Sequence, residues 1–258
     1  MKTLVVLGSE SFIGRHVVKY FEATSVSHKD LDLTKYDKVK EYFDDHPEIE
    51  YVVLCSTVGR NRQDDPVDTV EQNLRMFVNV TKFADRFKKV FWFSSGADSS
   101  SRYGFSKHIM EMLSVHEKNI TCLRIYGCFG VGELSTRFLS TCVREGHVNI
   151  NQDRYFDFFY VNDVCRVIEY CINNQNIPWR IDLVYNEKYK LSQFAEMIGS
   201  TYHIDAETTN EYTGIRGQIE LTFQPMSLLL QKFREDYIHN LHLQESSRDA
   251  HQEEIHRA

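Results

Sequence analysis

The sequence predicts an α/β fold with a doubly wound parallel sheet, because short apolar runs alternate with amphipathic segments along the first half of the chain. Four runs are typical of buried strands: 3–7, 51–55, 89–93 and 120–125. The segments between them carry apolar residues at helical spacing: 13–23, 35–46, 67–87 and 103–116. Strands separated by helices predict a parallel sheet with helices on both faces. A glycine turn after the first strand makes the pattern typical of a Rossmann-type fold.

Further elements are expected outside these runs: a short strand at 25–27, a helix at 134–146, a strand at 148–150, and a strand and helix within 157–174. The segments 181–200 and 211–243 indicate a smaller α/β substrate lobe. We assign 1–150 to a dinucleotide-binding domain, to which 157–174 returns, and 175–243 to the substrate lobe. Residues 244–258 contain one large apolar residue, so we expect a flexible tail there.

Composition excludes several classes of partner. The 258 residues carry a formal net charge of −7, with acidic and basic residues interspersed. This distribution has no basic stripe for a nucleic-acid backbone, so we expect no nucleic-acid partner. No run approaches the roughly 20 apolar residues of a membrane span, and the run at 3–7 is too short for a signal peptide. We therefore expect a cytoplasmic protein with no membrane partner.

The cysteines indicate neither disulfides nor a metal site. They are scattered, they form no Cys-x-x-Cys pair, and most lie inside apolar runs. The six are Cys55, Cys122, Cys128, Cys142, Cys165 and Cys171. We expect buried, reduced thiols and no metal.

The turn after the first strand is a candidate dinucleotide site. It runs from Gly8 through Ser11, Phe12 and Ile13 to Gly14 and opens a helix, whose first amides can hold a pyrophosphate. Ser11 stands where a middle glycine is usual, and its hydroxyl can itself donate to a phosphate. The alternative is an ordinary strand-to-helix turn.

The choice between NADP(H) and NAD(H) stays open. Glu10 disfavours a 2′-phosphate unless His28, Lys29 or Arg15 offsets its charge. Further on, Asp32 is placed to accept from the adenine amino group while the amide of Leu33 meets a ring nitrogen. A helix cap before 35–46 explains Asp32 equally well.

A second motif can move a proton. Ser94-Ser95-Gly96-Ala97 ends a strand, and Tyr103 and Lys107 follow at a spacing of four. A free phenol titrates near pH 10, so it must become more acidic to work near neutrality. A lysine one helical turn away favours the phenolate. Tyr36 and Lys40 have the same spacing, so only the context of the second pair makes it informative.

Taken in order, these motifs resemble the extended short-chain dehydrogenase/reductases. More narrowly, they resemble the NAD(P)-dependent epimerase/dehydratase family that acts on nucleotide sugars, which includes GDP-fucose synthase and dTDP-4-dehydrorhamnose reductase. The motifs are Gly8…Ser11…Gly14, Asp30-Leu31-Asp32-Leu33, Asn73-Leu74-Arg75, Ser94-Ser95-Gly96-Ala97, Tyr103…Lys107, Arg124-Ile125-Tyr126-Gly127 and Phe158-Phe159-Tyr160-Val161-Asn162-Asp163.

The resemblance implies a role for each motif. Tyr103 is the general acid/base, Lys107 also binds the nicotinamide ribose, and Ser95 hydrogen-bonds the substrate carbonyl. Asn73 matches a position that contacts the cofactor, with a buried polar helix residue as the alternative. The segment Cys55-Ser56-Thr57 would line the pyrophosphate and ribose. A homodimer is also implied.

Departures from the family pattern narrow the reaction. Only eight positions separate Ser95 from Tyr103, so the pocket is expected to be more open, and Ser94 or Ser99 could replace Ser95. Gly96 and Ala97 stand where dehydratases carry an Asp-Glu pair, and Ala97 stands where GDP-fucose synthase carries its cysteine. These positions favour reduction of a nucleotide-linked 4-keto-6-deoxy sugar. The alternatives are a 4-epimerase with tightly bound NAD and a non-catalytic cofactor-binding scaffold.

Two arginines are candidates for the substrate diphosphate. Arg137 and Arg154 can each bind its oxygens by charge-assisted hydrogen bonds. A solvated surface arginine is an equally good account of each.

Overall fold

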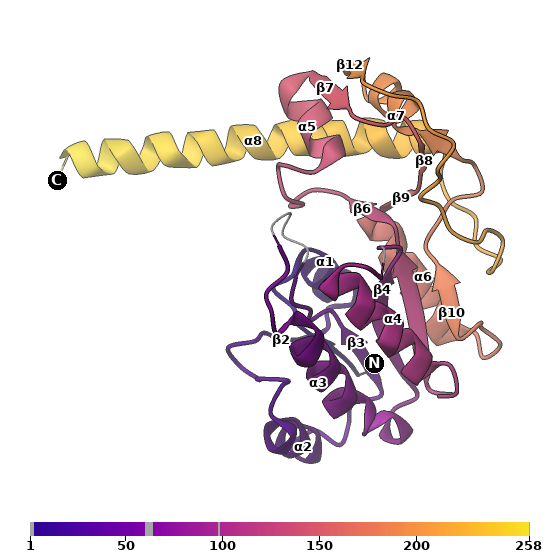
Figure 1. Cartoon of the computed structure of the whole chain (residues 1–258). Helices are drawn as coiled ribbons and strands as arrows, with labels where there is room; N and C mark the ends of the chain where they lie inside the picture. The colour runs from indigo at the N-terminus through magenta and orange to yellow at the C-terminus, as the bar shows by residue number, and fades with distance from the viewer. Residues whose placement is uncertain (1–2, 60–63, 98, 258) are drawn as a thin grey trace.

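The central element of the structure is a parallel sheet of six strands. The computed structural model describes residues 3–59, 64–97 and 99–257 (Figure 1). The strands are β1 (Leu4–Leu7), β2 (Thr24–Val26), β3 (Tyr51–Leu54), β4 (Lys89–Ser95), β5 (Ile120–Ile125) and β10 (Arg180–Asp182). Their order is β10-β5-β4-β3-β1-β2, and every pairing is parallel. The doubly wound, Rossmann-type fold predicted from the sequence is confirmed.

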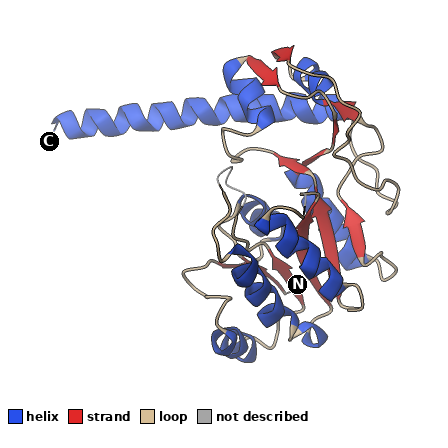
Figure 2. Ribbon diagram, viewed as in Figure 1, coloured by secondary structure: helices blue, strands red, loops and turns tan. Residues whose placement is uncertain are grey.

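Helices cover both faces of this sheet (Figures 1 and 2). One face carries α2 (Tyr36–Asp45), α3 (Thr69–Thr81) and α4 (Arg102–Ser114), and the other carries α1 (Phe12–Phe21) and α6 (Val161–Asn173). Alternate residues of each strand therefore enter two separate apolar layers: Trp92 of β4 packs with the first group of helices, and Phe91 with the second. Burial on both faces explains why the strands read as continuous apolar runs.

The helix expected at 67–87 is shorter in the structure. Helix α3 ends at Thr81, and a 3-10 helix, η1, follows at Ala84–Arg86. Between them, the buried Phe83 stacks on Tyr36, with the ring centroids 5.9 Å apart. The chain must leave the helical path to turn this ring toward α2, which the helical spacing alone does not indicate.

A second lobe sits beyond the carboxyl edge of the sheet. It contains α5 (Phe138–Glu145), β7 (His147–Ile150), β8 (Tyr155–Phe156), β11 (Tyr189–Lys190), α7 (Leu191–Met197), β12 (Thr201–Ile204) and α8 (Met226–Arg257). Two short strands, β6 (Gly127–Phe129) and β9 (Phe158–Tyr160), pair in parallel where the chain passes between the lobes.

The division between the lobes differs from the expected boundaries at 150 and 175. Strand β7 pairs with β12, so the chain around 138–150 packs with the second lobe. Conversely, β10 lies within the expected substrate lobe but pairs with β5 as the edge of the central sheet. Helix α5 also begins at Phe138 rather than at 134. Pairing between distant segments decides these boundaries, and local sequence does not show it.

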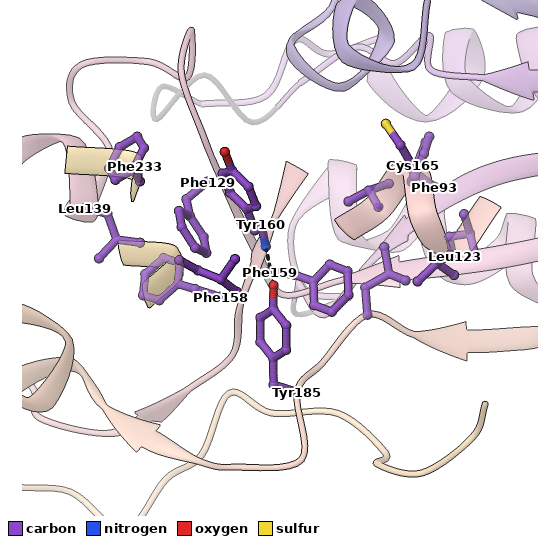
Figure 3. Packing of buried hydrophobic residues seen from close by; sticks show 14 of the residues in the cluster. Phe93, Leu123, Phe129, Leu139, Phe158, Phe159, Tyr160, Cys165, Tyr185 and Phe233 are labelled. Atoms are coloured by element: carbon purple, nitrogen blue, oxygen red, sulfur yellow. Dashed lines mark hydrogen bonds between the residues drawn. The ribbon is translucent and has the colours of Figure 1, made fainter. Parts of the chain in front are cut away.

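One apolar core runs through both lobes (Figure 3). Phe93 and Leu123 enter it from the sheet, Phe158 and Phe159 from β9, and Phe233 from α8. The shared core holds the second lobe against the end of the sheet.

A buried tyrosine fixes the centre of this core. The Tyr185 hydroxyl accepts from the Tyr160 amide at 3.1 Å, as Figure 3 shows, and donates to Asp163 Oδ2 at 2.7 Å. The ring of Tyr185 stacks on Phe159, with centroids 4.7 Å apart. Burial raises the pKa of the Tyr185 hydroxyl well above its usual value, so the group keeps its proton.

The C-terminal helix extends away from both lobes (Figure 1). Leu230 and Phe233 anchor its first turns in the core. Residues 244–258, expected to form a tail, continue α8 as far as Arg257. Among the helices of the described segments, none combines the length and apolar character needed to cross a bilayer.

We predict that Tyr185→Phe lowers the free energy of unfolding by about 1–3 kcal/mol, because Asp163 and the Tyr160 amide lose a buried partner. Urea unfolding followed by circular dichroism measures the change. Tyr20→Phe is the control, since the hydroxyl of the exposed Tyr20 bonds Glu169 at the surface. Equal midpoints for wild type and Tyr185→Phe would contradict the prediction.

Candidate active site

A cavity of about 400 Å³ opens at the carboxyl ends of β3, β4 and β5, beside the turn that follows β1. This edge of a doubly wound sheet is where such folds bind ligands. Most of the residues singled out from the sequence line it: Ser11, Phe12, Ile13, Cys55, Ser56, Thr57, Ser95, Tyr103, Lys107 and Arg137. Gly8 lies in the adjoining turn and Gly14 in the first turn of α1, whereas Asp32, Leu33, Asn73 and Arg154 do not line the cavity.

The first turn requires its two glycines. Gly8 has φ +81°, and a Cβ there would lie 2.5–2.9 Å from atoms of Ser56. A Cβ on Gly14 would lie 2.5 Å from the carbonyl oxygen of Gly8. The turn therefore packs closely against the segment after β3 and against the start of α1, and a side chain at either glycine would push these segments apart.

Ser11 is the N-cap of α1. Its Oγ accepts from the Gly14 amide at 3.1 Å, and Phe12 and Ile13 are the first two helical residues. The first amides of a helix have no partner within the helix, and the helix dipole favours an anion beside them. A tight glycine-containing turn that leads into the free amides of a helix N-terminus fits the pyrophosphate of a dinucleotide.

Asp32 and Leu33 are engaged in local structure. Asp32 Oδ1 accepts from the amide and the hydroxyl of Thr34, at 2.9 and 2.6 Å. Lys35 is the N-cap of α2, so Asp32 does not cap this helix and that alternative was wrong. Leu33 is buried, and its carbonyl accepts from Asn79 at 2.9 Å. The adenine contacts expected of Asp32 and Leu33 stay a prediction.

Asn73 holds the loop after β3 in place. Its Oδ1 accepts from the Val58 amide at 2.8 Å, and its Nδ2 donates to the Val58 carbonyl and to Ser106 Oγ, both at 3.0 Å. Ser106 belongs to α4, so Asn73 ties the Thr57–Val58 loop to the helix that carries Tyr103 and Lys107. The Asn73 side chain does not line the cavity, but its hydrogen bonds hold the loop that does.

Helix α4 places Tyr103 and Lys107 on the same wall of the cavity. Ser101 caps the helix by accepting from the Gly104 amide at 3.0 Å, and Asp65 Oδ2 accepts from the Tyr103 amide at 2.8 Å. Lys107 Nζ lies 5.4 Å from the centroid of the Tyr103 ring. One helical turn thus brings the phenol and the ammonium together, as their spacing predicted.

Lys107 is a buried cation. The side chain is 4% exposed, and its Nζ lies 5.9 Å from the Trp92 ring centroid. Burial lowers the pKa of Lys107 to about 8, because water no longer stabilises the charged form. The ammonium is still protonated at neutral pH, where it can favour ionisation of the neighbouring phenol.

The two serines at the end of β4 have different environments. Both border the cavity, but the buried Ser94 hydroxyl donates to Glu111 of α4. Ser95 Oγ accepts from the Ala97 amide at 3.1 Å and keeps its hydroxyl proton for another acceptor. Ser99 is exposed and does not line the cavity. The arrangement therefore favours Ser95 over Ser94 or Ser99.

Comparison with protein-family models matches residues 4–181 to the NAD dependent epimerase/dehydratase family. The chain belongs to this family. The match confirms the resemblance inferred from the motifs. The protein is accordingly an NAD(P)-dependent enzyme of the epimerase/dehydratase type, with NADP(H) or NAD(H) as its cofactor.

Solved structures with the same fold include three that span nearly the whole chain. A GDP-L-fucose synthetase from Naegleria fowleri bound to NADP is 16% identical, with 93% of this chain and 94% of that chain covered and a TM-score of 0.71. A dTDP-4-dehydrorhamnose reductase from Clostridium acetobutylicum is 16% identical, with 93% and 99% covered and a TM-score of 0.66. The Bordetella bronchiseptica enzyme WbmH in complex with NAD⁺ is 12% identical, with 91% and 97% covered and a TM-score of 0.72. No curated protein matches. At these identities the likeness shows the fold.

The cysteines of this epimerase/dehydratase are unpaired thiols. Cys55 and Cys128 line the cavity. Burial raises the pKa of Cys55 to about 12 and that of Cys128 well above its usual value. Both stay protonated at neutral pH, which makes them poor bases.

The two candidate substrate arginines are separated by the fold. Arg137, the N-cap residue of α5, lines the cavity, whereas Arg154 precedes β8 and does not. Some residues that line the cavity were given no site role from the sequence, among them Tyr126 and Leu134. Tyr126 directly follows β5, and a polar aromatic residue just after a parallel strand is the signal that could have identified it.

We predict that Lys107→Met stabilises the cofactor-free protein at pH 7 by up to about 3 kcal/mol, since a pKa lowered from 10.5 to about 8 reflects a buried charge of that cost. Between about pH 8 and 10.5 the unfolded wild-type chain binds more protons than the folded chain, so wild-type stability rises with pH and the difference shrinks. Urea unfolding at pH 7 and 10 measures both effects.

The exposed Lys118→Met is the matched control, with no change expected at either pH. If Lys107→Met has a lower free energy of unfolding than wild type at pH 7, the prediction is contradicted, because the buried ammonium then does not destabilise the folded protein.

Proposed function

We propose that this member of the epimerase/dehydratase family is an NAD(P)H-dependent reductase of a nucleotide-linked 4-keto-6-deoxy sugar. The observation that carries the proposal is the convergence of Ser95, Tyr103 and Lys107 on one cavity that also meets the Gly8–Gly14 turn. Two of the similar structures are named as a GDP-L-fucose synthetase and a dTDP-4-dehydrorhamnose reductase, which supports a nucleotide-sugar substrate.

In the proposed reaction, Tyr103 donates a proton to the ketone oxygen of the sugar, and this oxygen becomes a hydroxyl. Ser95 donates a hydrogen bond to the same oxygen, which orients the carbonyl and stabilises the negative charge that develops on it. A bound reduced nicotinamide supplies the hydride that the carbonyl carbon receives. Lys107 stabilises the phenolate left on Tyr103 and hydrogen-bonds the nicotinamide ribose.

The two ends of the cavity suit the two ligands. The proposed cofactor end consists of the first turn and the loop after β3: Gly8, Ser11, Phe12, Ile13, Gly14, Cys55, Ser56 and Thr57. At the proposed substrate end, Arg137 binds the sugar-nucleotide diphosphate, because a guanidinium matches phosphate oxygens in charge and geometry. The position of Arg137 on the cavity makes it a better candidate than Arg154.

We predict that the purified protein binds NADPH or NADH with a rise in nicotinamide fluorescence and oxidises it when GDP-4-keto-6-deoxymannose or dTDP-4-keto-6-deoxyglucose is added. Absorbance at the reduced-nicotinamide band measures turnover. Tyr103→Phe should lower kcat by at least about 100-fold, because a general acid contributes on that order, with unchanged affinity for the cofactor.

The exposed Tyr20→Phe is the control for Tyr103→Phe. Cofactor binding without oxidation by either substrate would instead favour the non-catalytic scaffold. Inversion of a 4-hydroxyl without net oxidation of added cofactor would favour the 4-epimerase.

We also predict that affinity for the cofactor falls as the pH rises above about 8, because Lys107 then loses the proton with which it binds the ribose. The dissociation constant of NADPH, measured by fluorescence from pH 6.5 to 9.5, should be flat below this point and rise above it. In Lys107→Met the binding should be weaker throughout and lose this pH dependence. A wild-type curve that stays flat to pH 9.5 would contradict the assigned role.

A further inference from the structure

Tyr126 forms the wall behind the catalytic turn at Ser95–Ala97. It directly follows β5 and lines the cavity together with Ser95 and Tyr103. A Cβ on Gly96 would lie 2.4 and 2.5 Å from Cδ1 and Cε1 of the Tyr126 ring. The backbone of Gly96 therefore lies directly against this ring, and only glycine allows so close an approach.

The other side of the ring meets the second lobe. A Cβ on Gly214 would lie 2.6 Å from Cε2 of Tyr126 and 2.8 Å from Oδ2 of Asp182. The ring of Tyr212 packs edge-on against Tyr126, with centroids 5.3 Å apart and an interplanar angle of 79°. Tyr126 is thus held between the backbone of the catalytic turn and the backbone around Gly214.

The hydroxyl of Tyr126 is fixed by a buried carboxylate. It donates to Asp182 Oδ2 at 3.1 Å, and the same oxygen accepts from the Ile215 amide at 2.9 Å. Asp182 is 5% exposed, and its Oδ1 lies 3.4 Å from Arg180 Nε. Burial and the charge of Asp182 raise the pKa of Tyr126 to about 12, so the hydroxyl keeps its proton and remains a donor.

Two amide hydrogen bonds also hold the Ser95–Ala97 turn. The Gly96 amide donates to the Ile125 carbonyl at 2.8 Å, and the Ala97 amide donates to Ser95 Oγ at 3.1 Å. The first bond continues the β4–β5 pairing, and the second lies within the turn itself. The ring of Tyr126 lies against the Gly96 backbone and blocks movement of the turn in its direction.

We propose that Tyr126 is a positioning residue: Asp182 fixes its ring, and the ring fixes the Ser95–Ala97 turn so that Ser95 Oγ meets the substrate carbonyl. The part of the proposal that concerns the carbonyl rests on the proposed reductase function. A shift of about 1 Å in a positioned group can cost on the order of 100-fold in rate.

The test compares variants in the oxidation of NADPH by GDP-4-keto-6-deoxymannose or dTDP-4-keto-6-deoxyglucose. Tyr126→Phe keeps the ring and removes its anchor, and we expect kcat to fall about 5- to 20-fold with the cofactor KM within about 2-fold of wild type. The deuterium isotope effect with cofactor labelled on the transferred hydrogen should increase, because a misplaced Ser95 slows hydride transfer itself.

Tyr212→Phe is the matched control, because it removes a hydroxyl from the neighbouring ring. That buried hydroxyl has no hydrogen-bond partner among the described residues. We expect this variant to keep the wild-type kcat. Gly96→Ala should lower kcat because the new methyl group displaces the turn from the ring. Combining it with Tyr126→Val removes the clash and should restore part of the lost rate.

A second measurement needs no turnover. Amide hydrogen exchange of a peptide covering residues 93–97 in the cofactor-free protein should be at least about 3-fold faster in Tyr126→Phe than in wild type or Tyr212→Phe, because the turn is freer to open. If the wild-type protein reduces neither ketosugar but exchange is still faster in Tyr126→Phe, the proposed function fails and the positioning role holds. The positioning role is overturned if Tyr126→Phe exchanges at the wild-type rate. It is also overturned if the wild type is active and Tyr126→Phe has the same kcat and isotope effect.

Discussion

The parallel pairing of β4 with β5 is the constraint on which the candidate site depends. Its register sets Ser94 opposite Arg124 and Ser95 opposite Ile125. Because side chains alternate along a strand, the Ser94 hydroxyl bonds Glu111 of α4, whereas Ser95 Oγ bonds within its own turn, and both serines border the cavity. A slip of one residue would exchange the two serines and separate Arg124 from Glu111, with which it forms a partly buried ion pair. The backbone bonds between β4 and β5 therefore place the Ser95–Ala97 turn and the ion pair of Arg124 with Glu111.

The burial of Lys107 is a cost to the stability of this fold. Lys107 is buried between the Trp92 and Tyr103 rings, where its charge is poorly stabilised and its pKa falls to about 8. The same burial strengthens the field that the ammonium exerts on the Tyr103 phenol, since less water screens it. The shared core between the lobes, with Phe159 and Tyr185 at its centre, supplies stability that offsets this cost.

Much of this arrangement was predictable from local pattern. The strand at 120–125 and the Tyr103–Lys107 pair follow from periodicity and spacing, and the structure has both where they were expected. The homodimer and the cytoplasmic location stay predictions. The sixth strand, β10, was not anticipated, because its three residues form a strand only by pairing with β5. Asn73 was singled out because its motif resembles that of the family, but its partners at Val58 and Ser106 lie 15 and 33 positions away.

By itself, the sequence determined the alternation of strands and helices in the first half of the chain, the glycine turn and the spacing of Tyr103 and Lys107, because each depends on residues within about one helical turn or one strand of each other. Only the tertiary structure decided that Ser94 bonds Glu111, that Arg137 and not Arg154 lines the cavity, and that the Tyr126 ring lies against Gly96. These outcomes depend on strand register and on contacts between segments far apart in the chain. The spacing of residues in a single sequence does not predict such contacts.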